Sequence, residues 1–405
     1  MKVFRRGWLA VGAAFAAMLV AVEARAQGSP ILPETRSMRA GPVTVYPTIA
    51  IRDVGVDSNV YNDATGPKGD FTYSLTPRFY VTLPAANTRF VGRALSTLTY
   101  YQTYKDQQAI SGLFDGRYEV VGPGFRPFAS AGYADRRERR GYEIDARLRQ
   151  RQTTAMAGAD IDVTAITALT AWASRTTTTW ERNAAYEGLL LSDQLDYTKH
   201  TLAAGMQFRV TPLTTITAAA EVERDRFDES SFRDANTIKV GPRVDFETTA
   251  LVNGHVEAAY RSFAPLSPNI ATFNGLTTSA QLRYRFRDWT EVKIEADRDV
   301  DYSYDPLQPY YLASGGRLEV TQRLVGPFHM IGIGDRRNVD HQLVGGRGFN
   351  GRQEVTRIVG GGVVLQFRKQ LRFELVYERT VRTSSDSGAR EYQRQRVLAS
   401  AIYGQ

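Results

Sequence analysis

An adjacent acid and imidazole, Asp340-His341, are the side chains of this sequence most suited to proton transfer. A carboxylate and a histidine within hydrogen-bond reach can act as an acid–base pair in hydrolysis. The pair lies in a polar stretch, and the sequence holds no Gly-x-Ser-x-Gly element that would supply a nucleophile for acyl transfer. A hydrolase is therefore only a minor alternative, and we expect a protein without catalytic residues that is not an enzyme.

A glycine-rich segment, Gly346-Arg347-Gly348-Phe349-Asn350-Gly351, matches the dinucleotide-binding fingerprint by letter. That chemistry needs a strand before the turn and a helix after it, because the helix N-terminus holds the phosphates. No helical pattern follows this segment, which lies among polar residues. We therefore interpret it as a loop that binds no cofactor.

Four aspartates, Asp297, Asp299, Asp301 and Asp305, could supply the oxygen ligands that calcium prefers. On a strand the first three would point the same way, about 7 Å apart. They lack the tight glycine loop of a dedicated calcium site. The sequence also has no cysteine and four histidines without ligand-like spacing. We expect neither a metal nor a cofactor, and we interpret the aspartates as part of a charged wall.

The segments that carry these residues alternate between apolar and charged positions, and only Arg298 breaks the apolar face. Before Arg287, the apolar Leu282, Tyr284 and Phe286 alternate with basic residues, and beyond Trp289 apolar residues alternate with acids. Successive side chains of a strand lie on opposite faces, so this hairpin has one apolar face and one charged face. Charged side chains on neighbouring strands stabilise each other when their signs are opposite.

Tight turns recur along the chain at intervals of roughly 40 residues, which indicates a repeated structural unit. Each interval holds two alternating segments that can cross a tilted apolar band of about 25 Å, and these segments are longer than the strands usual in sandwiches and propellers. The pattern predicts an all-β fold, a transmembrane antiparallel up-and-down β-barrel of about 18 strands, with 16 as the alternative. The expected strands lie near residues 43–53, 70–83, 88–104, 110–121, 125–135, 150–162, 166–180, 196–210, 214–228, 236–249, 253–263, 276–287, 289–303, 310–324, 327–338, 353–367, 371–382 and 391–403.

The start of the chain reads as a secretory signal. Three basic residues precede an apolar stretch, and Ala24-Arg25-Ala26 is a small-x-small cleavage motif. We expect residues 1–26 to be a signal peptide that is cut between Ala26 and Gln27. Residues 27–42 would then be a flexible periplasmic leader, and residues 43–405 the barrel.

The charged face of the expected strands supplies the candidate functional residues. The formal net charge is +8, but basic and acidic residues are interleaved and not gathered in a patch, so we expect no binding of nucleic acid. The side chains that we expect to line the lumen are Arg283, Arg285, Arg287, Glu291, Lys293, Glu295, Asp297, Asp299, Asp301, Lys239, Arg243, Asp245, Glu247, Arg372 and Glu374.

A short stretch near the first expected strand, Gly55-Val56-Asp57-Ser58-Asn59-Val60-Tyr61, resembles the segment near the first hairpin of the putative β-barrel porin 2 family. The similarity in layout covers about residues 41–405. The resemblance implies an outer-membrane barrel associated with extracellular polysaccharide, and it supplies no catalytic residues. Outer-membrane barrels of this kind usually end on an aromatic residue, whereas here Tyr403 is followed by Gly404-Gln405.

These observations together predict a passive, porin-like channel with a charged lumen in the outer membrane of a Gram-negative bacterium. The expected partners are membrane lipid, the barrel assembly machinery, and polysaccharide or small hydrophilic solutes. The alternative from a different class is a structural or docking barrel with a closed lumen, which would anchor surface polysaccharide or a partner. Paired Arg and Asp can fill a lumen as well as line one, so the sequence leaves both open.

Overall fold

The computed structural model of this chain describes residues 37–139, 142–247, 251–287, 289–367, 370–386 and 390–404. The expected signal peptide and its Ala26–Gln27 junction lie outside these residues. The end of the expected leader lies inside them, and there Met38–Ala40 forms a short strand, β1, which pairs with the start of the next strand. The last part of the expected flexible leader is therefore held by backbone pairing to β2.

Within the described residues, eighteen long strands form the barrel. In chain order they are β2 (Val43–Asp57), β3 (Asp70–Ala85), β4 (Thr88–Tyr101), β5 (Ala109–Val120), β6 (Phe125–Arg139), β7 (Arg147–Asp162), β8 (Thr167–Trp180), β11 (Tyr197–Thr211), β12 (Thr214–Phe227), β13 (Ala235–Phe246), β14 (Val252–Pro265), β15 (Phe273–Phe286), β16 (Thr290–Tyr302), β17 (Tyr310–Val325), β18 (Phe328–Gln342), β19 (Gln353–Phe367), β20 (Leu371–Ser384) and β21 (Tyr392–Tyr403). The loops hold β9 (Ala185–Tyr186), β10 (Leu189–Leu190), helix α1 (Leu191–Leu195) and two 3-10 turns, Lys105–Gln107 and Ser231–Arg233.

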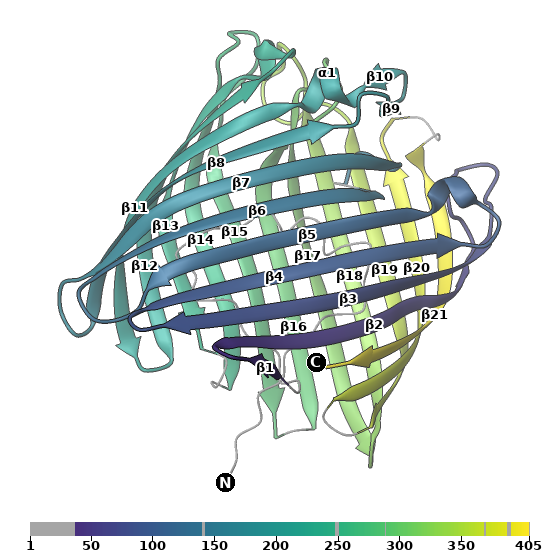
Figure 1. Ribbon diagram of the computed structural model, residues 1–405. Helices are drawn as coiled ribbons and strands as arrows, with labels where there is room; N and C mark the ends of the chain where they lie inside the picture. Colours follow the sequence, from purple (N-terminus) through teal and green to yellow (C-terminus); the bar gives the residue numbers. More distant parts are fainter. Residues whose placement is uncertain are drawn as a thin grey trace.

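Each barrel strand pairs antiparallel with the next, and β2 pairs with β21, so the sheet closes on itself (Figure 1). A closed barrel leaves none of these strands as an unpaired edge. The prediction of an antiparallel up-and-down barrel is confirmed. The predicted count of 18 strands is also confirmed, and the alternative of 16 strands is wrong. Every predicted segment overlaps one observed strand.

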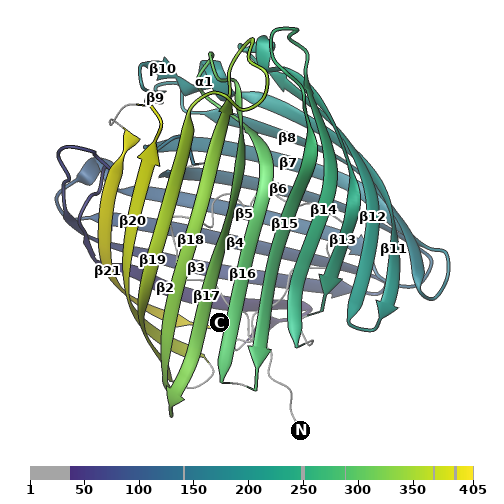
Figure 2. The ribbon, with the colours of Figure 1, turned by 180° about the vertical axis from the view of Figure 1, so that it is seen from behind.

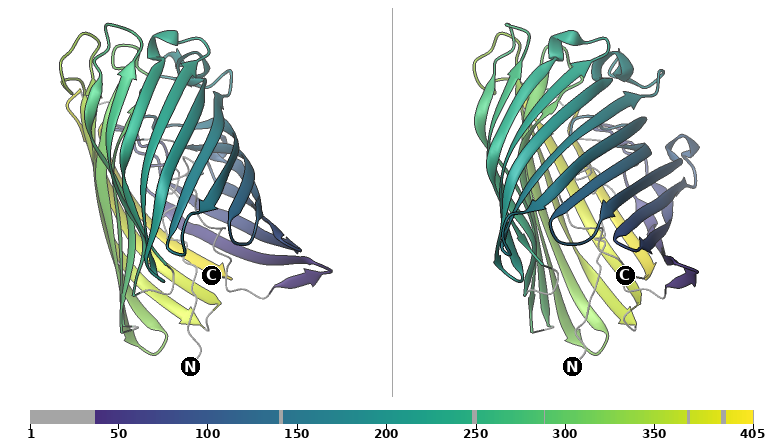
Figure 3. Two further views of the ribbon diagram at one scale, coloured as in Figure 1. Left: turned by 90° about the vertical axis from the view of Figure 1, so that its left-hand side faces the viewer. Right: turned by 60° about the vertical axis from the view of Figure 1, so that its left-hand side comes forward.

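The two ends of the barrel differ in the length of their connections. The connections at one end are tight, while those at the other end are longer and carry α1, β9 and β10, which lie at the top of Figure 1. Seen from behind and from the sides, the strands slope strongly across the wall (Figures 2 and 3). Among the described residues, no helix has the length and apolar character needed to span a bilayer.

The strands alternate between two faces because their side-chain period is two. One face carries exposed apolar side chains such as Leu202 (64%), Val359 (59%) and Phe114 (54%). The other face carries charged side chains that contact one another across strands that are not neighbours. Arg261 of β14, for example, reaches Glu223 of β12 and Asp299 of β16. Such contacts cross the concave side of the wall, so the charged face points into the barrel.

One proline lies inside a barrel strand without breaking it. Pro242 of β13 keeps its place in the ladder with β12, opposite Ala218. On the other side, pairing of β13 with β14 is interrupted between Val240 and Arg243 and resumes in the same register. Proline lacks the N–H that a ladder needs, and the strand tolerates it because the interruption falls at this position.

Candidate functional site at the long-loop end of the barrel

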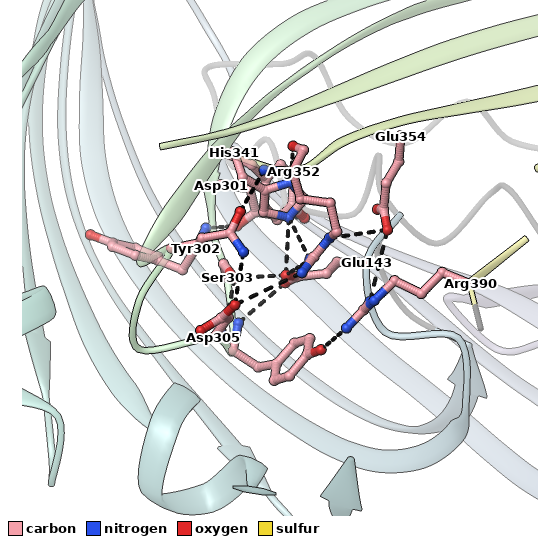
Figure 4. Close-up of polar contacts among 12 residues, drawn as sticks. Glu143, Asp301, Tyr302, Ser303, Asp305, His341, Arg352, Glu354 and Arg390 are labelled. Carbon is pink, nitrogen blue, oxygen red and sulfur yellow. Dashed lines mark hydrogen bonds and ion pairs between the residues drawn. The ribbon is translucent and has the colours of Figure 1, made fainter. Parts of the chain in front are cut away.

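A single carboxylate, Glu143, connects the loops at the long-loop end (Figure 4). It follows β6 in the chain, and 2% of its surface is exposed. Its Oε1 accepts hydrogen bonds from Ser303 Oγ at 2.7 Å and from Arg352 Nη2 at 2.6 Å. His341 Nε2 lies 3.0 Å from the same oxygen, and the backbone N–H of Tyr304 donates to Oε2 at 3.2 Å.

The groups around Glu143 also hold each other. His341 Nδ1 lies 2.8 Å from the carbonyl oxygen of Arg352, and Arg352 Nη2 lies 2.8 Å from His341 Nε2. Burial by itself raises the pKa of Glu143, but the hydrogen bond from His341 and the charges of His341 and Arg352 outweigh that effect and place the pKa below its usual value. The carboxylate is therefore charged at neutral pH.

The loop that carries Glu143 reaches the opposite wall of the barrel. Counted from β2, the strands β6 and β7 are the fifth and sixth of the ring, whereas β16 to β19, which bear its partners, are the thirteenth to sixteenth. These two groups lie half a circumference apart. The connection between β6 and β7 therefore spans the opening at this end.

Two further residues fix this connection on either side of Glu143. Asp145 receives a hydrogen bond of 2.6 Å from Asn62 and lies 3.4 Å from Arg382 and 3.2 Å from Arg139. The guanidinium of Arg337 lies over the Tyr142 ring, 3.8 Å from its centroid. The segment is thus held at Tyr142, Glu143 and Asp145 by residues from several parts of the barrel.

An apolar cluster packs beside these polar contacts. It consists of Ile144, Trp180, Ala184, Leu191, Leu195, Phe227 and Tyr304. These residues come from the β6–β7 connection, the β8–β11 loop with α1, the end of β12 and the β16–β17 loop. Leu191 is fully buried. The loops of the long-loop end therefore form a small core of their own across the opening.

The long-loop end of the β16–β17 hairpin leans over the opening. Pairing of β15 with β16 ends at Arg298, whereas β16 stays paired with β17 as far as Tyr302. Val300 and Tyr310 lie beyond that point, on the face of the hairpin that is apolar and exposed nearer the turn. Both are buried here (7% and 2% exposed) and pack in one cluster with the inward-facing Phe263. The hairpin end has left the wall and covers part of the barrel interior.

Asp196, which directly follows α1, is a carboxyl group with a raised pKa in this loop cluster. Burial, with the charges of Asp228 and Asp193, raises its pKa from 3.8 to about 6, against the opposing effect of the hydrogen bond from the Trp180 backbone (2.6 Å). Because the pKa of Asp196 is higher in the folded loop than in the unfolded chain, protonation stabilises the folded loop. The stability of the loop therefore falls as pH rises from about 4 through 6.

We expect protease cleavage in residues 181–196 to increase over that range, and we expect Asp196→Asn to abolish the increase. A pH profile identical in the two proteins would contradict this assignment.

The structure places most of the predicted charged residues on the inner face, in ion pairs. Lys239 pairs with Glu257 at 2.6 Å, and Lys293 pairs with Glu319 at 2.6 Å. The remaining pairs are Arg243–Asp245, Arg285–Glu291, Arg283–Glu291, Asp297–Arg337, Asp299–Arg261 and Arg372–Glu374. Asp301 accepts a hydrogen bond from Tyr311, and Glu295 stands opposite Arg317 in the β16–β17 register.

Two of the predicted residues lie apart from this wall. Arg287 occupies the β15–β16 turn with a left-handed backbone (φ 47°), is exposed, and lies over the Phe286 ring. Glu247 follows β13 and is exposed at the short-turn end. Strict alternation places both on the charged face, but the chain has already turned at these positions.

The candidate catalytic pair is not assembled. Asp340 and His341 are successive residues of β18, so their side chains point to opposite faces, and His341 is fully buried on Glu143. Ser303 donates its hydroxyl hydrogen bond to the same carboxylate. Within the described residues, no group of three or more acidic or histidine side chains is arranged to hold a metal.

Sequence reasoning missed the residues at the centre of this site. Glu143, Ser303 and Arg352 lie in three different loops, and any two of them are more than 40 residues apart in the sequence. No spacing rule connects such positions, because only the closed ring brings the loops together. His341 was singled out, but its partner is Glu143 and not the neighbouring Asp340.

The segment that carries the family resemblance forms a bonded turn where the barrel closes. Asp57 pairs with Arg394 of β21, and its Oδ1 accepts the backbone N–H of Asn59 at 3.1 Å. The Asn59 amide donates to the carbonyl oxygens of Asp63 (2.8 Å) and Gln393 (3.0 Å). These short polar side chains thus tie the β2–β3 loop to the last strand.

Comparison with known proteins gives both a family and a fold. The profile of the family described as putative beta-barrel porin 2 matches residues 33–403. Among solved structures, the chain is similar to Pseudomonas aeruginosa OccK2 (OpdF) in complex with glucuronate, with 11% identity, 89% of this chain and 98% of that chain covered, and a TM-score of 0.50. A second structure of OccK2 (OpdF) from the same organism gives 10% identity, coverages of 89% and 97%, and a TM-score of 0.50. At this identity the likeness concerns the fold alone. No curated protein sequence matches the chain.

Proposed function

Because the chain belongs to the putative beta-barrel porin 2 family, we propose that it is a passive channel for hydrophilic solutes in the outer membrane of a Gram-negative bacterium. The observation that carries this proposal is the division of the wall into two faces. Apolar side chains such as Val359 and Leu202 are exposed on the outside, and paired charges cover the inside. Such a barrel suits lipid around it and water within it.

The inner charges are nearly balanced, and this shapes the proposed selectivity. Opposite charges on neighbouring strands stabilise each other, but each pair is worth only about 0–1 kcal/mol where water reaches it. Their main effect is then on the field inside the pore, which filters charged solutes. Arg283 and Arg285 share one carboxylate, Glu291, at 3.9 and 3.2 Å, so this part of the wall has an excess of positive charge.

Replacing Arg283 and Arg285 together by Gln tests the proposed lumen. The double variant removes two positive charges and keeps side chains of similar length, so we expect selectivity to shift toward cations. The measurement is the reversal potential in a planar bilayer across a salt gradient. Arg287→Gln is the matched control, because that side chain is exposed at the turn, and we expect a smaller shift.

A closed docking barrel is the second candidate, and the loop cluster around Glu143 favours it. Loops that pack across the opening could seal the barrel permanently and present a surface to a partner. The same recordings separate the two functions. If Arg283→Gln/Arg285→Gln lowers the stability of the barrel, and neither the wild type nor the variant conducts ions, the lumen is a filled core and the channel proposal fails.

We propose acidic polysaccharide, or sugars derived from it, as the cargo of the channel. The family resemblance implies a link with extracellular polysaccharide, and the OccK2 structure of similar fold is a complex with glucuronate, an acidic sugar. Guanidinium groups bind carboxylates in a two-pronged manner, and the excess arginine near Glu291 offers such groups. The recordings described above, repeated with glucuronate on one side, measure this preference.

A further inference from the structure

Arginines interrupt the apolar outer face of the barrel near its long-loop end. Six of them are Arg175, Arg224, Arg298, Arg336, Arg357 and Arg379. All occupy positions that alternate with the inward-facing residues of their strands, and five are exposed while Arg298 is half-buried. The alternation that identifies the strands does not account for these arginines, because it reserves the lipid-facing positions for apolar side chains.

Three of these arginines form one cluster on β18, β19 and β20. Arg336 and Arg357 stand directly opposite each other in the register, and Arg379 is the diagonal neighbour of Arg357, since it pairs with Val359. Like charges placed directly opposite destabilise a sheet. Arg336 bonds the amide oxygen of Asn338, and Arg379 bonds that of Gln393. Among the described residues no carboxylate lies within ion-pair distance of the three.

The position of the cluster along the strands matches the edge of a membrane. On β19 the apolar outer stretch runs from Arg357 to Phe367 and includes Val359 and Val363, both more than half exposed. Ten residues span about 33 Å along a strand at about 3.3 Å each, which corresponds to about 25 Å of height at a tilt of about 40° and equals the apolar band of such barrels. An arginine on the lipid-facing side within that band would destabilise the barrel far more than one at the edge of the band.

Just below the cluster, glycines leave a gap between exposed apolar side chains such as Val359 and Leu318, which both pair with Gly334 in the register. Gly332 and Gly361 are paired in the register, and Gly334 follows on β18 toward Arg336. A Cβ added at Gly332 or Gly334 would meet no atom within 4 Å, so both positions face open space. An extended hydrocarbon chain could lie in this gap, against the apolar side chains beside it, while its headgroup reaches the arginines.

We propose that Arg336, Arg357 and Arg379 bind the phosphate of a phosphorylated lipid in the outer leaflet of the membrane. The long loops of such barrels face the outside, so this end meets the outer leaflet. The guanidinium fork matches phosphate oxygens, and an anion shared among three arginines removes their mutual repulsion. The binding site concerns the outer wall and is independent of whether the lumen conducts.

Native mass spectrometry of the full chain in mild detergent tests this site with phosphorylated lipid A as the probe. We expect the wild-type protein to retain the lipid and Arg336→Gln/Arg357→Gln/Arg379→Gln to retain at least ten times less. The matched control is Arg39→Gln/Arg209→Gln/Arg323→Gln, which removes three exposed arginines at the short-turn end and should retain the lipid like the wild type. Heat-modifiable migration on a gel shows whether each variant is folded, and Arg357→Gln alone replaces the triple variant if that protein fails to fold.

Three outcomes would overturn the proposal. The first is equal retention by the wild type and the folded arginine variant. The second is equal retention of lipid A whose phosphates have been removed, because the phosphate is the group that the arginines are assigned to bind. The third is retention of a soluble acidic polysaccharide in place of the lipid.

Discussion

Replacing Glu143 by Ala is expected to release the loops that cross the barrel opening and to raise single-channel conductance. Removing one member of a buried ion pair costs about 3–5 kcal/mol, because the remaining charge stays buried without its partner. Here Arg352 and His341 lose the carboxylate that both contact, and Ser303 loses its acceptor. Planar-bilayer recording measures the conductance, and hydrogen exchange of residues 303–309 measures the loosening of the loop.

The matched control is Glu229→Ala, which removes an exposed carboxylate from the β12–β13 loop and should leave conductance and exchange unchanged. The double variant Glu143→Ala/Arg352→Ala should lose less stability than the sum of its single variants, because it leaves no unpaired guanidinium at this position. Unchanged conductance and unchanged exchange in Glu143→Ala would show that this carboxylate does not hold the loops in place.

Placing an arginine in the middle of the apolar outer band is expected to produce the second large effect. Val363 of β19 is 51% exposed and lies between Arg357 and Phe367. Since lipid covers this face, Val363→Arg should destabilise the barrel by about 2–4 kcal/mol. Urea titration of folding into lipid vesicles measures the free energy of unfolding.

The control for this experiment is Val355→Arg, two residues beyond Arg357 toward the long-loop end. Lipid-facing arginine costs about 0–1 kcal/mol near the interface, so this variant should remain close to wild type. Equal destabilisation by the two substitutions would contradict the placement of the membrane band, and with it the level assigned to the arginine cluster.

The sequence was sufficient to predict the fold because the wall of a barrel is a local pattern. Alternation within one strand decides which face meets lipid, and a tight turn such as the one at Arg287 decides where the next strand begins. Both signals lie within a few residues of each other in the chain. For the same reason, the ion pairs of the Arg283–Glu291 hairpin were within reach of sequence analysis, since their partners are separated by one turn.

The candidate site was not predictable in this way, because its members meet only when the ring closes. Glu143 lies 160 residues before Ser303 and 209 before Arg352, and nothing near any of the three marks the others. The leaning end of the β16–β17 hairpin was hidden for a related reason. Val300 and Tyr310 follow the alternation of lipid-facing positions, yet they are buried because the hairpin leaves the wall beyond Arg298.

Single-channel recording of the purified full chain tests the central claim, which is that water fills the charged interior and that docked loops restrict its outer opening. The account predicts discrete conductance steps from the wild-type protein and larger steps from Glu143→Ala under the same conditions. The absence of steps from both proteins, while both migrate as folded heat-modifiable barrels, would contradict it.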